Sequence, residues 1–73
     1  MEIKVHQAFR NIIKNKQEKA LNYCVEYARA GLHMTGRELK VQCLYVLNNM
    51  THWRGADARK ARNIIKKFIK TYN

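Results

Sequence analysis

The segment ADARKARNIIKKFIKTY, residues 56–72, decides the fold class because its apolar side chains recur at intervals of three and four. This spacing aligns them along one face of a helix with 3.6 residues per turn. Asp57 near its start and the lysines near its end also complement the helix macrodipole. The segment predicts a basic amphipathic helix over about 56–72, with an apolar stripe of Ala61, Ile64, Ile65, Phe68, Ile69 and Tyr72.

The N-terminal half predicts two more helices. Residues 2–14 carry one apolar stripe of the same period. Asn15 and Glu18 resemble a capping box, which predicts a second helix from about Lys16 to Gly31, where glycine can adopt the left-handed conformation that ends a helix. One continuous helix over 2–30 is the alternative, since asparagine is only a weak helix breaker.

Thr35 and Glu38 form a second capping-box pattern and predict a helix over about 36–50. Apolar residues occupy most of its circumference, which is typical of a buried helix. We expect it to be the central element of the fold or a subunit interface. The predicted fold class is all-α: a small bundle of four helices, or of three if the first two are continuous.

The 73 residues are enough for a single domain, 1–73, with a small core. The sequence has 47% hydrophobic and 27% charged residues, which is typical of a folded chain. No apolar run approaches the roughly 20 residues of a membrane-spanning helix, and the N-terminus has no signal-peptide pattern. We therefore expect a cytoplasmic protein that does not insert into membranes.

Positive charge is concentrated at the C-terminal end of a chain whose net charge is +10. Residues 54–73 hold seven of the 15 Lys and Arg residues and one of the five acidic residues. Solvated helices usually mix both signs and so gain favourable pairs at i, i+4. The imbalance indicates an anionic partner: nucleic acid, an acidic protein or an anionic membrane.

Nucleic acid is the partner that these cations favour most, and DNA is favoured over RNA. A row of Lys and Arg along one helix can follow a phosphate backbone and release counterions. Asparagine and arginine can also contact base edges in the major groove. Simple solvation of the polar face is the alternative. The candidate nucleic-acid-binding residues are Arg54, Arg59, Lys60, Arg62, Asn63, Lys66, Lys67 and Lys70.

Other binding modes have weaker support. Residues 24–47 have the helix, glycine-containing turn and helix of a DNA-binding helix-turn-helix, but the second helix offers few polar side chains to a groove. Trp53 is interpreted as a plug at the edge of the core, and stacking on a base is the alternative. Tyr23 and Tyr27, one turn apart, are interpreted as a packing or interface ridge.

Enzymatic and metal chemistry are not predicted. The chain has no serine, no CxxC or HxxxH pair and no glycine-rich phosphate loop. Its carboxylates are scattered, so no pair suggests acid–base catalysis. Cys24 and Cys43 fall on apolar helix faces and are predicted to be buried free thiols. We therefore expect a protein that is not an enzyme and needs no metal or other cofactor.

Residues 36–68, and above all LYVLNN followed by WRG, resemble segments of short proteins encoded by bacteriophages and prophages. The resemblance implies a phage or prophage product in a bacterial cytoplasm and assigns no functional residue. The sequence thus suggests an accessory or regulatory protein that binds nucleic acid through its last helix. One alternative is a modulator that binds an acidic surface of a host protein. Another is a homo-oligomeric structural module without a charged ligand.

Overall fold

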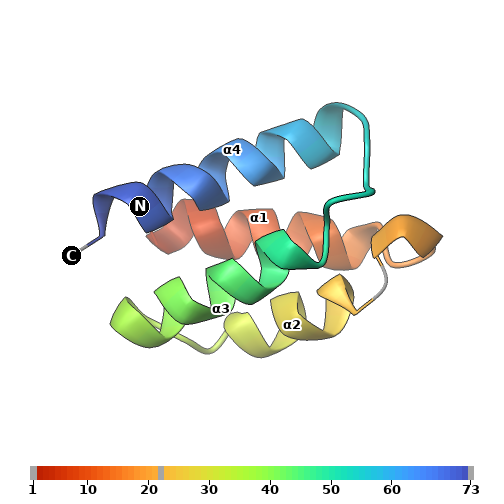
Figure 1. Ribbon diagram of the computed structural model, residues 1–73. Coiled ribbons are helices and arrows are strands. Elements are labelled where there is room, and N and C mark those ends of the chain that lie inside the picture. Colours follow the sequence, from red (N-terminus) through yellow and green to blue (C-terminus); the bar gives the residue numbers. More distant parts are fainter. Residues whose placement is uncertain (1, 22, 73) are drawn as a thin grey trace.

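The computed structural model describes residues 2–21 and 23–72 and is all-α over these ranges (Figure 1). The prediction of a small bundle of four α-helices is confirmed. A short 3₁₀ helix, η1, lies between the first two of them. The elements are α1 (Glu2–Lys14), η1 (Lys19–Leu21), α2 (Cys24–Gly31), α3 (Gly36–Asn48) and α4 (Ala56–Thr71).

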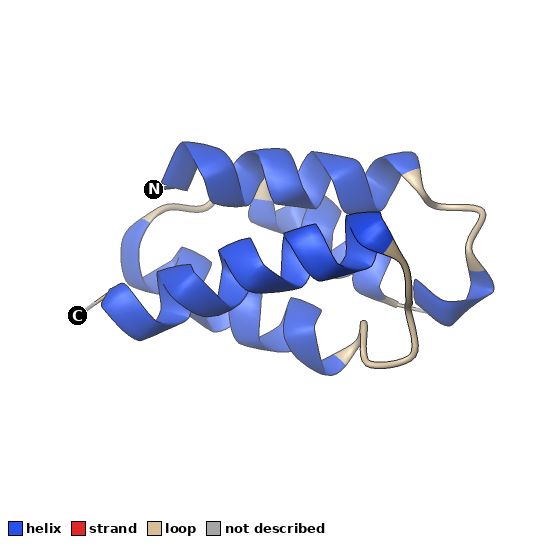
Figure 2. Ribbon diagram, turned by 90° about the horizontal axis from the view of Figure 1, so that it is seen from above, coloured by secondary structure: helices blue, strands red, loops and turns tan. Residues whose placement is uncertain are grey.

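Successive α-helices run in opposite directions, and α4 returns alongside α1 (Figures 1 and 2). The main helix contacts are α1 with α2, α2 with α3, α3 with α4, and α4 with α1. The helices therefore form a ring around one core. Each helix has one face toward that core and one toward solvent.

The predicted apolar stripes contribute to the core, although Ile64, Ile69 and Tyr72 of the predicted α4 stripe are only partly buried. In α1 these are Val5, Phe9 and Ile12, all with no exposed surface, and in α4 Ile65 and Phe68 are buried. Burial of each large aliphatic or aromatic side chain contributes about 1.5–3 kcal/mol relative to exposure. The remaining buried apolar residues are Ala8, Leu21, Cys24, Val25, Ala28, Leu39, Cys43, Val46, Met50, Trp53, Ala58 and Ala61.

The predicted break between the first two helices is confirmed, but the predicted start of the second is wrong. Asn15 does not cap a following helix, because its Nδ2 donates to the carbonyl of Asn11 at 2.8 Å and thereby closes α1. The Glu18 carboxylate accepts from the N–H of Ala20 at 3.3 Å at the start of η1. The apparent capping box thus serves two different elements, and α2 begins only at Cys24.

The start of α3 is as predicted, but its capping chemistry is different. The N-cap residue Thr35 makes no side-chain capping hydrogen bond. Instead, the carboxylate of Glu2 accepts a 2.8 Å hydrogen bond from the N–H of Gly36. Gly36 has φ +58°, in the left-handed region that favours glycine, and an added Cβ would lie 3.3 Å from the Tyr72 hydroxyl.

The third helix ends at Asn48, not near residue 50, and it is not buried on nearly every side as expected. Leu39, Gln42, Cys43 and Val46 face the core, whereas three large apolar side chains of α3 are exposed. These are Val41, Leu44 and Tyr45, at 42%, 44% and 50% of their surface. α3 is therefore one of four walls of the bundle and not its central element.

Gly31 ends α2 at the predicted position for a different reason. It is buried within the last turn and does not have the positive φ of a left-handed cap. A Cβ at this position would lie 2.3 Å from Cε2 of the Phe9 ring, well inside van der Waals contact. The glycine is therefore required by the close approach of the α2 backbone to the Phe9 ring on α1.

Trp53, in the loop between α3 and α4, has only 4% of its surface exposed. The prediction that it closes the edge of the core is confirmed. Cys24 and Cys43 are both buried free thiols, as predicted. No helix within residues 2–21 and 23–72 is both long enough and apolar enough to cross a membrane.

Candidate nucleic-acid interface

The basic residues of α4 project from the side opposite its buried stripe. Ala58, Ala61, Ile65 and Phe68 are buried and fix the rotation of the helix about its axis. This rotation follows from the three-and-four spacing of the apolar residues. Most of the predicted candidates on this helix are consequently exposed: Arg59, Lys60, Asn63, Lys66, Lys67 and Lys70.

Arg62 is the exception among the α4 candidates. It is half-buried, and its Nη2 donates hydrogen bonds to the carbonyls of Met50 and Trp53, at 3.0 and 2.9 Å. These carbonyls lie just beyond the end of α3, so the guanidinium holds the α3–α4 loop against α4. Arg62 therefore has a structural role that its sequence position did not reveal.

Arg54 is exposed but stands apart from the other candidates. It lies before α4 and lines a separate hollow with Glu18 and Asp57. Two carboxylates in the same hollow offset its charge and disfavour a phosphate at this position. Arg54 therefore does not extend the row of cations on α4.

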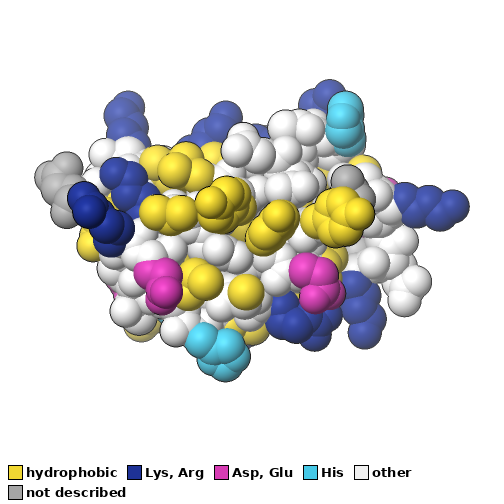
Figure 3. Space-filling model, turned by 60° about the horizontal axis from the view of Figure 1, so that its bottom comes forward, with side chains coloured by type: hydrophobic (Ala, Val, Ile, Leu, Met, Phe, Trp, Pro, Cys, Tyr) yellow, Lys and Arg dark blue, Asp and Glu magenta, His cyan; other side chains and the backbone are white. Residues whose placement is uncertain are grey.

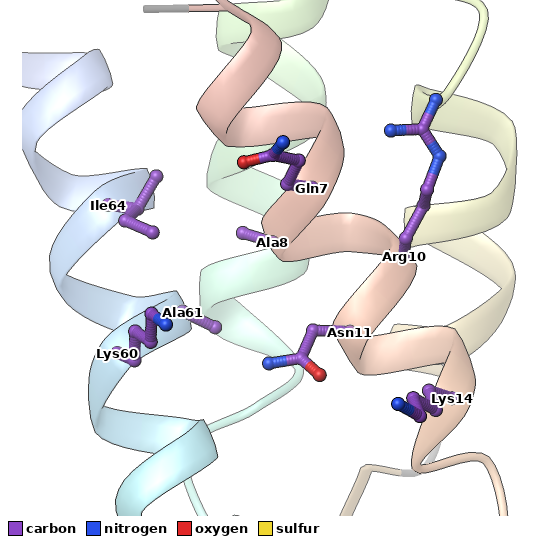
Figure 4. A pocket seen from close by; sticks show the side chains of 8 residues that line it. All are labelled: Gln7, Ala8, Arg10, Asn11, Lys14, Lys60, Ala61 and Ile64. Atoms are coloured by element: carbon purple, nitrogen blue, oxygen red, sulfur yellow. The ribbon is translucent and has the colours of Figure 1, made fainter.

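A groove of about 350 Å³ lies between α1 and α4. Gln7, Ala8 and Asn11 point from α1 toward α4, whereas the Arg10 side chain extends away from α4 (Figure 4). The groove thus has an apolar floor and polar edges contributed by both helices. Its lining residues are Gln7, Ala8, Arg10, Asn11, Lys14, Lys60, Ala61 and Ile64.

A second hollow of about 170 Å³ shares Ile64 with this groove and is also lined by Lys4, Asn63 and Lys67. Lys4 and Lys67 therefore border one end of the α1–α4 surface, and Lys14 and Lys60 border the other. Neither hollow has an acidic residue in its lining. We refer to this surface as the α1–α4 basic face, defined by Lys4, Gln7, Asn11, Lys14, Lys60, Asn63 and Lys67.

The candidate residues of α4 thus divide into two rows. Lys60 lines the groove, and Asn63 and Lys67 line the second hollow. Arg59, Lys66 and Lys70 line neither hollow and form an outer row along α4. The structure places these two rows beside a third, from α1.

The contribution of α1 was missed from the sequence. Lys4, Gln7, Asn11 and Lys14 recur at intervals of three and four, which is a polar stripe on the predicted first helix. The stripe was available in the sequence, but nothing local shows that it lies beside α4. Only the return of α4 alongside α1 joins the two sets of lysines (Figure 2).

Two cysteines and His6 carry further reactive or ligating side-chain groups. Burial raises the pKa of Cys24 to about 11 and that of Cys43 to about 12, so both thiols are protonated near neutral pH. His6 donates from Nε2 to the carbonyl of Met34 at 2.9 Å. Within residues 2–21 and 23–72, no three His, Cys, Asp or Glu residues are grouped so that they could hold a metal ion.

Comparisons with protein-family models, curated proteins and solved structures gave no match. The resemblance of residues 36–68 to phage-encoded proteins therefore stays a prediction. The geometry and charge of the α1–α4 basic face are the basis for a functional proposal.

Proposed function

We propose that this protein binds nucleic acid, with duplex DNA as the favoured form, through the α1–α4 basic face. The observation that carries the proposal is that Lys14 and Lys60 line the groove, Lys4 and Lys67 line the adjoining second hollow, and neither lining contains an acidic residue. Clustered cations on a concave surface concentrate positive potential and attract a polyanion.

The α1–α4 basic face is long enough to contact several phosphates of one DNA strand. Ten residues separate Lys4 from Lys14 on α1, which is about 15 Å along a helix axis. One strand of DNA advances about 3.4 Å per nucleotide along the duplex axis, so the lysines span about four nucleotides. The outer row of Arg59, Lys66 and Lys70 lies on the adjacent surface of α4 and extends the positive field.

Amide side chains between the lysines can add hydrogen bonds to the electrostatic attraction of the face. Gln7 and Asn11 line the groove from α1, and Asn63 lines its second hollow from α4. Asn and Gln can both donate to and accept from base edges or phosphate oxygens. Phosphate contacts would set the position of the duplex, and the amides would contact it within the groove.

Fluorescence anisotropy with a labelled duplex of random sequence tests the proposal. Four lysine–phosphate contacts predict a slope of log K against log salt of about −3.6 between 50 and 200 mM. The absence of binding at 50 mM salt would overturn the proposal. A slope near zero would also contradict it, because such binding would not depend on phosphate contacts.

Three double variants with the same net charge of +8 locate the site. Lys14→Gln with Lys60→Gln changes the groove, Lys66→Gln with Lys70→Gln changes the outer row, and Lys16→Gln with Lys19→Gln changes exposed lysines outside both. The groove variant should lose the most affinity, about tenfold or more at 50 mM salt, and its slope should fall by about 2 units. Equal losses in all three variants would show an effect of net charge alone.

Affinity purification from a bacterial lysate distinguishes nucleic acid from an acidic host protein, which is the alternative partner of the same cations. Co-purifying material should be lost after nuclease treatment and after the Lys14→Gln, Lys60→Gln change. A protein that remains bound after nuclease treatment, and is lost in the groove variant, would favour the modulator function instead.

A further inference from the structure

The outward face of α2 and α3 exposes a group of large apolar side chains that the core does not use. Figure 3 shows hydrophobic side chains in a row across this face, with acidic and basic groups beside it. Single exposed apolar residues are common, but a contiguous patch marks an interaction surface. We define the tyrosine patch as Tyr23, Tyr27, Val41, Leu44 and Tyr45, which are 37–66% exposed.

The patch is held in a defined shape. The rings of Tyr27 on α2 and Tyr45 on α3 stack with their centroids 5.7 Å apart and an angle of 22° between planes. Beneath them, Nε2 of the buried Gln42 donates to the carbonyl of Tyr27 at 2.7 Å and ties α3 to α2. Side chains fixed in this way lose little conformational entropy when they are covered.

We propose that the tyrosine patch is the interface of a two-fold symmetric homodimer. A two-fold contact joins the same patch on both copies, so any charges on the patch must be of both signs if they are to attract and not repel. The exposed charged residues of α2 and α3 satisfy this requirement with two acids and two bases: Glu26, Glu38, Arg29 and Arg37. The α1–α4 groove has no acid in its lining and could not face its own copy without repulsion.

Charge also favours a second copy over an acidic partner at this position. The chain carries a net charge of +10, so an acidic protein would be attracted more strongly to the α1–α4 basic face. A second copy is itself strongly basic and can approach only where the local charge is balanced. In such a dimer the α1–α4 basic faces of both copies remain uncovered.

The exposed apolar area is of the order that a dimer needs. With about 200 Å² per aromatic side chain, the exposed fractions of the three tyrosines amount to about 300 Å². Val41 and Leu44 increase this area. A stable dimer buries about 800 Å² per partner, of which roughly 60% is apolar, or about 500 Å².

Light scattering coupled to size-exclusion chromatography tests the proposal in the absence of nucleic acid. At tens of micromolar the mass should be near twice the 8.7 kDa of the chain. Raising salt from 50 to 200 mM should leave the dimer intact or strengthen it, because salt screens the repulsion between two basic copies. A mass of one chain at several hundred micromolar, or dissociation by salt, would overturn the proposal.

Matched variants assign the interface. Leu44→Ser removes an apolar side chain from the patch, and Ile3→Ser removes one that is even more exposed, at 73%, but lies on α1. Leu44→Ser should weaken self-association at least tenfold, and Ile3→Ser should leave it unchanged. An equal effect of both changes would indicate non-specific association and overturn the proposal. So would a monomer whose patch binds a different protein in a pulldown and loses it on Leu44→Ser.

Discussion

The carboxylate of Glu2 accepts a 2.8 Å hydrogen bond from the backbone N–H of Gly36, so the first residue of α1 caps the first turn of α3. The two residues are 34 positions apart. Hydrogen bonds between a charged group and an otherwise unpaired N–H are stronger than neutral ones, and a negative charge is favourable at a helix N-terminus. This contact takes the place of the local capping box that Thr35 and Glu38 suggest.

Glu2→Gln should lower the free energy of unfolding by about 1 kcal/mol, because it weakens the charged cap on Gly36. Chemical denaturation measures the change. Glu38→Gln is the matched control, since it removes a charge from the same first turn of α3 without touching the Gly36 contact. Equal effects of the two changes would show that only the helix dipole matters.

Gly31→Ala should destabilise the fold by about 1–3 kcal/mol, because the new methyl group overlaps the Phe9 ring. Helix propensity predicts the opposite sign, since alanine in a helix is favoured over glycine by about 1 kcal/mol. The Phe9→Leu, Gly31→Ala double variant should be more stable than Phe9→Leu alone, because the new methyl group no longer overlaps an aromatic ring. An increase in stability from Gly31→Ala would contradict the close contact.

Arg62→Gln should cost about 1–3 kcal/mol of stability, because it leaves the Met50 and Trp53 carbonyls without their donor. Arg59→Gln, three residues earlier and exposed, should change stability by no more than about 0.5 kcal/mol. Both variants lose one positive charge, so a difference in their thermal unfolding reports the hydrogen bonds of Arg62 and not the change in net charge. Similar melting temperatures for the two variants would argue against the loop contact.

Ile65→Ala should lower the free energy of unfolding by about 2–5 kcal/mol, because Ile65 has no exposed surface in the core. Ile3→Ala makes the same chemical change at a side chain that is 73% exposed and should have little effect. Urea denaturation of both variants measures the difference. A small loss at Ile65 would contradict the assignment of the α4 stripe to the core.

The buried thiols predict a loss of stability at alkaline pH. Cys24 and Cys43 have folded pKa values of about 11 and 12, above the value of 9.0 expected without burial. Their contribution is therefore intact below pH 9 and decreases as pH rises toward 11 and 12, because only the unfolded chain readily loses these protons. The Cys24→Ala, Cys43→Ala variant should show a shallower fall in stability between pH 9 and 10.5.

The same thiols should react slowly with a disulfide reagent at pH 8 in the native protein and rapidly in denaturant, because the reactive form is the thiolate. Absorbance of the released chromophore follows the reaction. A native rate close to the denatured rate would show that the two side chains are accessible.

The sequence by itself determined the parts of this protein that depend on local periodicity. The three-and-four spacing of apolar residues specified α1 and α4, their buried faces and the exposure of the α4 cations, because a helix fixes which residues share a side. Trp53 was assigned to the edge of the core because it lies in a short loop between helices, and the capping pattern of Thr35 and Glu38 located the start of α3 at Gly36. The same reasoning misplaced the start of α2, since Asn15 and Glu18 satisfy two separate backbone groups and not one cap.

The tertiary structure decided which of these faces meet. The return of α4 beside α1 creates the groove between Lys14 and Lys60, and the packing of α2 on α3 leaves Leu44 and Tyr45 uncovered. It also directs the Arg62 guanidinium, a candidate contact to nucleic acid, to the carbonyls of the α3–α4 loop. These relationships join residues that are distant in the chain, and they depend on how the helices are arranged, which the period of a single helix does not encode.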